Sequence, residues 1–354
     1  MDFLSFLGIL LKILVVVGVT QGAVAYLIWV ERKVAAYAQD RIGPNRSGRE
    51  FGVPFGLLQP LADGAKMLLK EDVIPRYVNK PLYILAPAIA IIAAMIGFAV
   101  VPFGTVGPNS PKLFGYALEF QVAPGVDVGI VYVFAIGSLA VYGVILGGWA
   151  SNNKYSFLGG MRSSAQIISY EIPLGMSILG MVLLAGSLDL NAIINWQDRH
   201  VWGVVVQPIG FLLFLISAFA ETNRLPFDLP ESEQELVGGY HTEYSAMKFG
   251  MFFLGEYLHV ITVSYLVVVL FFGGWDIPFL TDQSQSGWLW ALLKMGVMAS
   301  KVALMIFFMM WIRWTIPRFR YDQLMDLAWK SLIPLSIVNL VLTAGIVQWW
   351  RMTF

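Results

Sequence analysis

The sequence contains no cysteine and little charge. Without cysteine the chain can form no disulfide, no thiol nucleophile and no cysteine-ligated zinc or iron–sulfur site. Charged residues make up only 13% of the 354 residues, whereas hydrophobic residues make up 58% and the mean hydropathy is +0.70. A soluble domain usually has about 25% charged and about 45–50% apolar residues. The composition therefore excludes a water-soluble enzyme, a disordered chain and a secreted disulfide scaffold, and it indicates an integral membrane protein.

Histidine is also scarce. The three histidines are His200, His241 and His259, and only His259 falls within a long apolar stretch. A haem held by histidines from two membrane spans therefore lacks its second ligand. Together with the absence of cysteine, this predicts that the chain binds no metal and no redox cofactor of its own. Any electrons must then come from a partner.

Long apolar stretches account for most of the chain. A helix crosses the hydrocarbon core with about 20 apolar residues. Eight stretches qualify, at residues 3–30, 82–102, 128–150, 166–187, 201–220, 249–273, 288–312 and 331–350. Because an open sheet leaves backbone groups unsatisfied in lipid, the sequence predicts an all-α polytopic membrane protein. Residues 1–354 are expected to form one integral membrane domain with eight transmembrane helices.

Lys and Arg are unevenly distributed between the two sides of this bundle. The loops after the first, third, fifth and seventh spans carry nearly all of them, whereas the opposite side has only Lys112, Arg199 and Arg351. Positive residues favour the cytoplasmic side of a membrane. We therefore predict that these loops are cytoplasmic and that both termini are periplasmic. The 12 Trp residues and the lack of cysteine favour a bacterial inner membrane.

The first cytoplasmic loop contains a predicted amphipathic helix at about residues 57–70. At helical spacing its apolar residues share one face and its charged residues share the other. The apolar face carries Leu57, Leu58, Leu61, Ala65, Leu68 and Leu69, and the charged face carries Asp63, Lys66 and Lys70. Such a helix lies at the membrane surface. It could face an apolar ligand, or it could be a passive membrane anchor.

An acidic segment follows the fifth span, on the side where basic residues are expected. Crowded carboxylates can share protons near neutral pH. A solvated acidic loop is the alternative, but Pro226 and Pro230 alternate with apolar residues and indicate a packed loop. We therefore favour a functional role for its acids, which are Glu221, Asp228, Glu231, Glu233, Glu235 and Glu243.

Among the ionisable residues inside predicted spans, three are candidates for a pathway across the membrane. Glu171 lies about 7.5 Å from the cytoplasmic end of its span, Glu256 lies about 12 Å in, and Lys301 lies near mid-membrane. A charge at this depth costs at least about 2.5–3.5 kcal/mol and usually marks a pathway. The sequence thus suggests a proton or ion relay from the acidic segment into the membrane. Structural pairing of each group is the alternative.

Several motifs resemble the H membrane subunit of respiratory complex I, the proton-translocating NADH:quinone oxidoreductase. They occur in order from about residue 25 to residue 335. They are Glu31-Arg32-Lys33, Asp40-Arg41-Ile-Gly-Pro-Asn45, Leu57-Leu-Gln-Pro-Leu-Ala-Asp63, Lys70-Glu71-Asp72, Ser169-Tyr170-Glu171, Glu221-Thr-Asn-Arg224-Leu-Pro-Phe-Asp228, Glu235-Leu-Val-Gly-Gly-Tyr240-His-Thr-Glu243 and Pro317-Arg318-Phe-Arg320-Tyr-Asp322-Gln. A related subunit occurs in membrane-bound hydrogenases.

The resemblance implies a non-redox subunit that joins a hydrophilic arm to a proton-pumping membrane arm. It implies that Glu31, Arg32, Asp63 and Arg313 line the quinone chamber or its mouth. It also implies that a proton-coupling route begins at Glu171, Glu221, Asp228, Glu231, Glu233 and Glu235. The positions of the residues themselves add Glu243, Glu256 and Lys301 as further candidate members of the relay.

The resemblance also implies partners. These are the iron–sulfur subunit at the quinone site, its neighbour in the hydrophilic arm and small membrane-arm subunits, with FMN and iron–sulfur clusters in the partners. Membrane lipids and quinone are expected to bind, and nucleic acid is not. Some members of the family carry an additional buried acid in the third span, whereas residues 128–150 contain none. The alternatives are a subunit of a related hydrogenase complex, which could serve only as a structural anchor, and a stand-alone ion transporter.

Overall fold

The structure, a computed structural model, describes residues 3–106, 110–113, 116–117, 119–229, 233–277 and 287–353. This part of the chain is all-α apart from a two-residue antiparallel pair, β1 (Lys112–Leu113) and β2 (Tyr116–Ala117). The predicted polytopic α-helical fold is confirmed. The α-helices are α1 (Phe3–Ala38), α2 (Gln59–Leu69), α3 (Lys80–Ile96), α4 (Gly129–Ala150), α5 (Lys154–Ala185), α6 (Leu190–Arg199), α7 (Gly203–Val206), α8 (Pro208–Glu221), α9 (Glu233–Leu236), α10 (Ala246–Phe271), α11 (Trp288–Thr315), α12 (Tyr321–Asp326) and α13 (Ile333–Thr353).

Short helical segments of other types connect or extend these helices. Three are 3₁₀-helices, η1 (Arg49–Phe51), η2 (Gly97–Ala99) and η3 (Gly239–His241). The fourth, η4 (Leu327–Leu332), is π-helical and joins α12 to α13. The predicted span at 331–350 is therefore the C-terminal part of a longer helical segment that begins at Tyr321.

Seven described helical segments are long and apolar enough to cross a membrane. The predicted span at 201–220 differs from the other seven predictions. It is divided at Gln207 into α7 and α8, and the 14 residues of α8 extend only about 21 Å. Pro208 cannot donate a backbone hydrogen bond into a preceding turn, which accounts for a helix start at this position. The described helices thus give seven full-length candidate spans and one shorter apolar helix, in place of the eight predicted.

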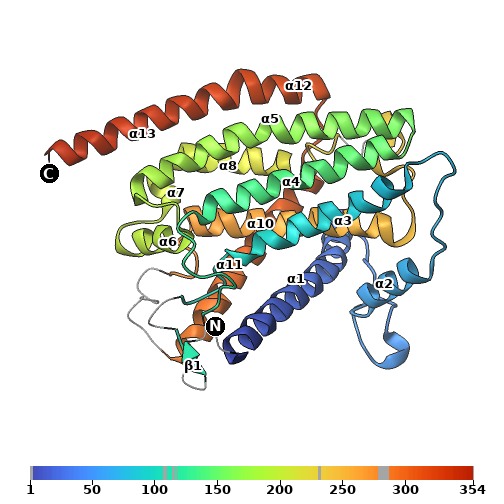
Figure 1. The fold of residues 1–354 in the computed structure, drawn as a ribbon, viewed down its shortest axis with the longest axis horizontal. Coiled ribbons are helices and arrows are strands. Elements are labelled where there is room, and N and C mark those ends of the chain that lie inside the picture. The colour runs from blue at the N-terminus through green and yellow to red at the C-terminus, as the bar shows by residue number, and fades with distance from the viewer. Residues whose placement is uncertain are drawn as a thin grey trace.

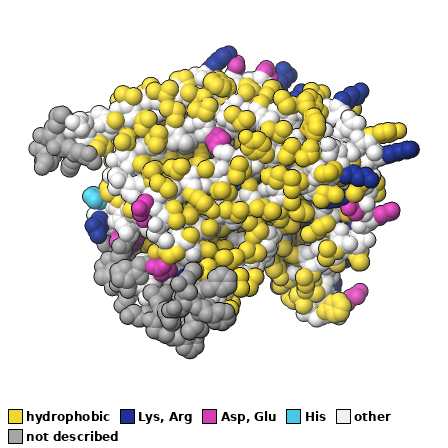
Figure 2. Space-filling view, in the orientation of Figure 1, with side chains coloured by type: hydrophobic (Ala, Val, Ile, Leu, Met, Phe, Trp, Pro, Cys, Tyr) yellow, Lys and Arg dark blue, Asp and Glu magenta, His cyan; other side chains and the backbone are white. Residues whose placement is uncertain are grey.

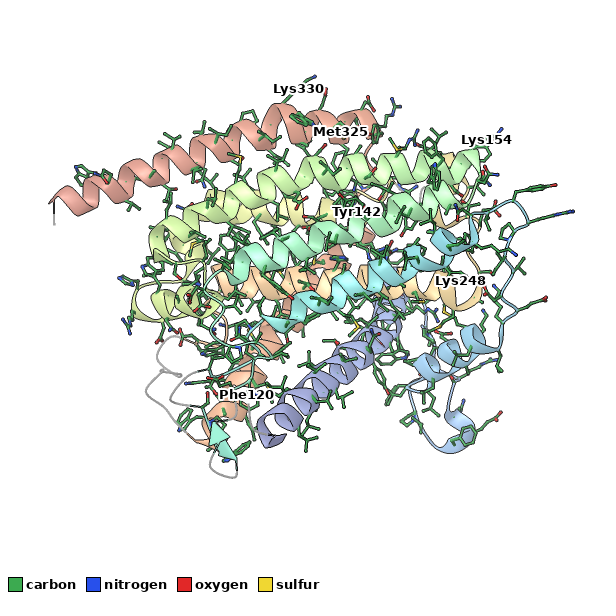
Figure 3. The ribbon with its side chains drawn as sticks, viewed as in Figure 1. Phe120, Tyr142, Lys154, Lys248, Met325 and Lys330 are labelled. Carbon is green, nitrogen blue, oxygen red and sulfur yellow. The ribbon has the colours of Figure 1, made fainter. Side chains whose placement is uncertain are left out.

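The helices form a bundle in which α3, α4 and α5 run side by side and α13 lies along the outer edge (Figure 1). Helix α10 is the most buried of the candidate spans, because 72% of the residues in its most apolar stretch are buried. It packs against α1, α3, α8 and α11. Apolar side chains cover most of the visible surface, and most visible Lys and Arg lie toward its right-hand and upper edges (Figure 2). Lys154 and Lys248 mark one end of the bundle (Figure 3). The direction of insertion remains a prediction.

The predicted amphipathic helix is confirmed as α2. It packs against α1 and α10. Its apolar face is uncovered, because Leu61 is 69% exposed, Leu68 is 71% exposed and Leu69 is 87% exposed. An apolar surface of this kind is suited to contact lipid or a ligand that arrives through lipid.

Glycines allow close contacts between helices at the end of the bundle near the acidic segment. A Cβ atom on Gly143 would lie 2.9 Å from the carbonyl oxygen of Ala86, and one on Gly159 would lie 2.7 Å from the backbone of Gly239. Small residues let membrane helices approach in this way. The contact at Gly159 fixes η3 against α5, and η3 carries Tyr240 toward the interior.

Replacing Gly159 with Ala tests this contact. Overpacking a tight site usually costs about 1–3 kcal/mol. We expect G159A to lower the thermal unfolding temperature of the purified assembly and to reduce its yield. Gly175→Ala on the same helix is the matched control, since a Cβ there meets no atom within 4 Å. Equal stability of the two variants would contradict the proposed fixing of η3.

Candidate functional site

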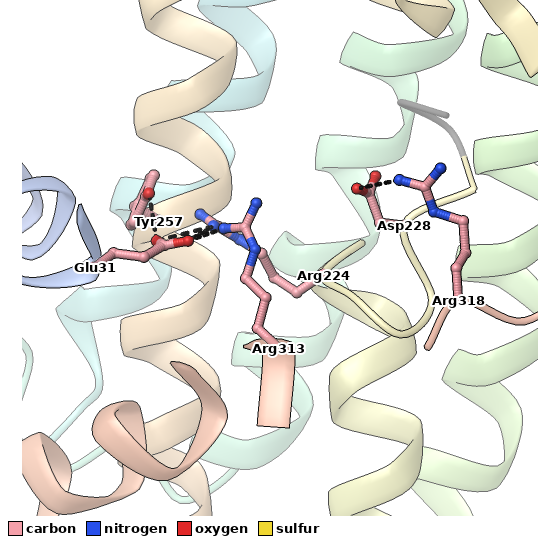
Figure 4. A network of polar contacts seen from close by, with 6 residues as sticks. All are labelled: Glu31, Arg224, Asp228, Tyr257, Arg313 and Arg318. Carbon is pink, nitrogen blue, oxygen red and sulfur yellow. Dashed lines mark hydrogen bonds and ion pairs between the residues drawn. The ribbon is translucent and has the colours of Figure 1, made fainter. Parts of the chain in front are cut away.

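A buried polar cluster lies where α1, α10, α11 and the segment after α8 meet (Figure 4). Its centre is Glu31, which is 6% exposed. Arg313 at the end of α11 donates to Glu31 Oε1, and Arg224 Nη1 lies 3.2 Å from Glu31 Oε2. The hydroxyl of Tyr257 on α10 donates to the same Oε2 at 2.5 Å. One carboxylate therefore joins three segments that are distant in the sequence.

The cluster has the features that make a buried charge tolerable. Charge-assisted hydrogen bonds are about twice as strong as neutral ones. The guanidinium carbon of Arg224 lies 3.9 Å from the centroid of the Tyr257 ring, close enough for a cation–π interaction. Glu31 thus holds two arginines in fixed positions near the C-terminal end of α1.

The four residues predicted for the chamber form two separate pairs. Glu31 contacts Arg313 inside the bundle, whereas Arg32 Nη1 pairs with Asp63 Oδ2 at 2.7 Å on the outside. Gln59 also donates to Asp63 at 2.9 Å. Consecutive residues on a helix point about 100° apart, so α1 sends Glu31 into the bundle and Arg32 toward α2. The outer pair fixes α2 beside α1.

A cavity of about 50 Å³ lies among α3, α4, α5, α8 and α10. This volume is enough for water. Two of the predicted acids line it, Glu221 at the end of α8 and Glu256 on α10. Tyr240 and His259 also line it, and the Tyr240 hydroxyl donates to Glu256 Oε1 at 2.8 Å. Acidic groups from distant parts of the sequence therefore line one cavity.

Helix α4 connects the third acid to this cavity. Ser138 Oγ donates to Glu171 Oε1 on α5. The preceding residue, Gly137, lines the cavity, and a Cβ on it would lie 4.0 Å from Glu221 Oε1. The apolar third span, which has no acid of its own, therefore brings Glu171 and Glu221 to adjacent positions. The polar group that α4 contributes to this contact is the hydroxyl of Ser138.

Helix α10 is shared by the buried cluster and the cavity. Glu256 faces the cavity, while its neighbour Tyr257 donates to Glu31. Adjacent helix positions point in different directions, and here the two directions lead to the two sites. A small rotation or shift of α10 would change both sites together.

Three other predicted acids, Asp228, Glu235 and Glu243, are not among the residues that line the cavity. Asp228 Oδ2 is 3.2 Å from Arg318 Nη2, and Glu235 Oε2 is 2.6 Å from Arg162 Nη1. Glu243 Oε1 accepts from Asn153 at 2.6 Å. Glu233 begins α9, but its side chain lies outside the described part of the chain, as does the whole of Glu231.

Lys301 lies far from the cavity. Its ammonium donates to the backbone carbonyls of Phe272, Gly274 and Asp276, and it lies 4.7 Å from the centroid of the Trp202 ring. Carbonyls at a helix C-terminus attract cations. From Glu256 to the end of α10 the distance is about 23 Å. The structure therefore does not bring Lys301 together with the acids, and it assigns Lys301 a contact at the opposite end of α10.

Sequence reasoning did not assign roles to Arg224, Tyr240 or Tyr257. Their contacts join segments far apart in the chain, and no local pattern indicates them. The one available signal was position, because Tyr257 follows Glu256 and Arg224 follows Glu221 by three residues. Among the described residues no group of three or more His, Asp and Glu side chains could hold a metal ion.

Comparison with known proteins identifies the family. The family model described as NADH dehydrogenase matches residues 11–344. The chain belongs to the NADH dehydrogenase family. Its relatives include the H subunit of NADH-quinone oxidoreductase from Thermomicrobium roseum, 48% identical over 95% of this chain and 94% of the relative. The corresponding protein of Protochlamydia amoebophila is 50% identical over 91% and 92%, and one from Cytophaga hutchinsonii is 47% identical over 90% and 91%.

This family membership agrees with the resemblance seen in the sequence motifs. The match covers every residue of the buried cluster and of the cavity lining, from Glu31 to Arg313. Similarity to these NADH-quinone oxidoreductase subunits extends over nearly the whole length of both chains.

Proposed function

We propose that the chain is a membrane subunit of a proton-pumping NADH:quinone oxidoreductase in a bacterial inner membrane. In this proposal it forms the opening and part of the chamber for quinone and couples quinone reduction to proton movement. The names of its relatives support membership of such a complex. The main support for the coupling role is that α10 contributes Tyr257 to the Glu31 cluster and Glu256 to the acid-lined cavity.

The α2 region supports a lipid-side opening. The apolar face of α2 is exposed, and the pair between Arg32 and Asp63 fixes this helix next to α1. A quinone has a polar headgroup and an apolar tail. The exposed apolar face of α2 suits the tail, whereas the polar cluster inside the bundle suits the headgroup. This difference favours entry of the headgroup first.

The chemistry of the substrate explains why acids are needed. Conversion of quinone to quinol takes two electrons and two protons, and the electrons would come from iron–sulfur clusters and FMN in partner subunits. Negative charge that develops near an enclosed site acts strongly, because the effective dielectric constant is low. The arginines held by Glu31 are attracted to that charge. Their displacement pulls on Tyr257 and α10.

Movement at α10 would then reach the cavity. Glu256 is the next residue before Tyr257, so it moves with that tyrosine. A change in its position relative to Glu221 alters the cost of having both carboxylates charged in one cavity, and a proton enters or leaves. Glu171, held by Ser138, is positioned to exchange this proton with the acidic segment.

The proposal is tested by gentle purification of the intact complex through a tag on this chain. We expect co-purified flavin and iron, quinone reduction by NADH and acidification of the lumen when the complex is reconstituted with its NADH site outward. Iron with hydrogenase activity and no quinone reduction would contradict the proposal and favour the related hydrogenase complex. Ion transport by the isolated chain would also contradict it.

Changing the exposed face of α2 tests the opening separately. We expect Leu68→Glu to raise the KM for a long-tailed quinone by about tenfold, because a buried CH₂ group of a quinone tail contributes about 0.8 kcal/mol and a charge disrupts this contact. The KM for a short-tailed, water-soluble quinone should change much less. Lys66→Glu on the charged face is the matched control. An equal effect on both quinones would count against a tail-binding face.

A further inference from the structure

His259 is a titratable residue in the cavity for which no role follows from the arguments above. It lies one helical turn after Glu256, so the two side chains share a face of α10. Both line the cavity together with Glu221. An imidazole is unusual among groups at this depth because it has one nitrogen that accepts a proton and another that donates one.

The surroundings of His259 favour contact with water. Among the described residues none forms a hydrogen bond with its ring, and His259 is half-buried in the lining of the cavity. The cavity volume of about 50 Å³ accommodates water beside it. The imidazole therefore differs from Tyr240, whose hydroxyl is already engaged with Glu256.

The charged and titratable groups in the lining are few. Glu221 comes from α8, Tyr240 from η3, and Glu256 with His259 from α10, whereas α3, α4 and α5 contribute only Ala, Gly, Val and Ile side chains. No Lys or Arg occurs in the lining among the described residues. His259 is thus the one lining group there that can carry a positive charge beside two carboxyls.

We propose that His259 transfers protons between Glu221 and Glu256 through water in this cavity. A carboxyl group releases its proton to water, one imidazole nitrogen accepts a proton, and the other releases one through water to the second carboxylate. No electron moves, and each proton accepted is matched by one released. The transient imidazolium is stabilised by the carboxylate that has just lost its proton. This inference rests on the proposed coupling function.

The test uses the intact complex in liposomes, with quinone reduction and proton uptake measured in parallel from about pH 6 to pH 8.5. We expect His259→Gln to lower the number of protons pumped per NADH or the coupled rate by at least threefold. We also expect it to change the pH profile and to reduce the solvent deuterium isotope effect on pumping. His200→Gln is the matched control, because His200 is exposed, stacks on Trp196 and does not line the cavity.

His259→Asn provides a second variant if the first assembles poorly, and flavin per complex reports assembly. Unchanged pumping, pH profile and isotope effect in an assembled variant would overturn the role of His259. If the unmodified complex reduces quinone without pumping, the proposed function itself fails. If the complex pumps and Glu221→Gln stops pumping while His259→Gln does not, only the inference about His259 fails.

Discussion

Replacing Glu221 with Gln should reduce proton pumping by at least about tenfold while leaving the complex assembled. Gln has nearly the same size and retains hydrogen-bonding groups, but it cannot carry an exchangeable acid proton. Glu221 lines the cavity with Glu256 and lies close to Gly137 of α4, so the packing can accept the substitution. Loss of a positioned proton-transfer group commonly costs about 10²–10⁴ in rate. The measurement is protons moved per NADH oxidised in liposomes.

The control for Glu221 is a carboxylate outside the proposed route. Asp127 is exposed and precedes α4 at the end of the bundle distant from Lys154. Asp127→Asn should leave pumping unchanged. If E221Q pumps as well as this control at equal flavin content, Glu221 is not part of the coupling route.

Replacing Glu31 with Gln should have the largest effect on stability. Glu31 is 6% exposed and contacts Arg224, Arg313 and Tyr257. Removing one member of a buried ion pair costs about 3–5 kcal/mol, because the partner charge remains buried. We therefore expect E31Q to lower the thermal stability of the membrane arm and the yield of complete complex. Thermal unfolding of the purified complex measures this effect.

An exposed ion pair provides the comparison for Glu31. Lys330 and Asp326 are 72% and 61% exposed and lie one helical turn apart. Exposed pairs contribute about 0–1 kcal/mol, so Asp326→Asn should leave assembly unchanged. Equal stability of E31Q and D326N would show that the Glu31 cluster is not a structural centre of the bundle.

Apolar length and periodicity were sufficient to predict most of the helices. Uninterrupted apolar runs such as residues 128–150 correspond closely to α4, and the periodic segment at 57–70 contains α2. The span at 201–220 was predicted less well, because hydropathy averages over Gln207. In the structure Gln207 donates to Thr343 at 2.7 Å and accepts from Asn339 at 3.2 Å. These partners on α13 satisfy the polar side chain at the point where the helix is interrupted. A hydropathy value averaged over many residues does not detect such an interruption.

The sequence was sufficient to predict which residue types make up the candidate site. It was not sufficient to predict how those residues are grouped in space. Buried acids are costly in a membrane, so Glu171 and Glu256 were recognisable from the sequence alone. Their grouping was not, because it depends on distant contacts. Glu31 meets Arg224, Tyr257 and Arg313 across separations of 193, 226 and 282 residues. Such separations leave no periodic signal, so the division into a Glu31 cluster and an acid-lined cavity required the structure.

The central claim is that cavity carboxyls change protonation when quinone is reduced. Infrared difference spectroscopy of the intact complex, between its oxidised and quinol-producing states, measures this most directly. We predict a carbonyl-stretch difference band from a protonated carboxylic acid that shifts in D₂O and is lost in E221Q but retained in D127N. A spectrum with no such band, or with a band unchanged in E221Q, would contradict the claim.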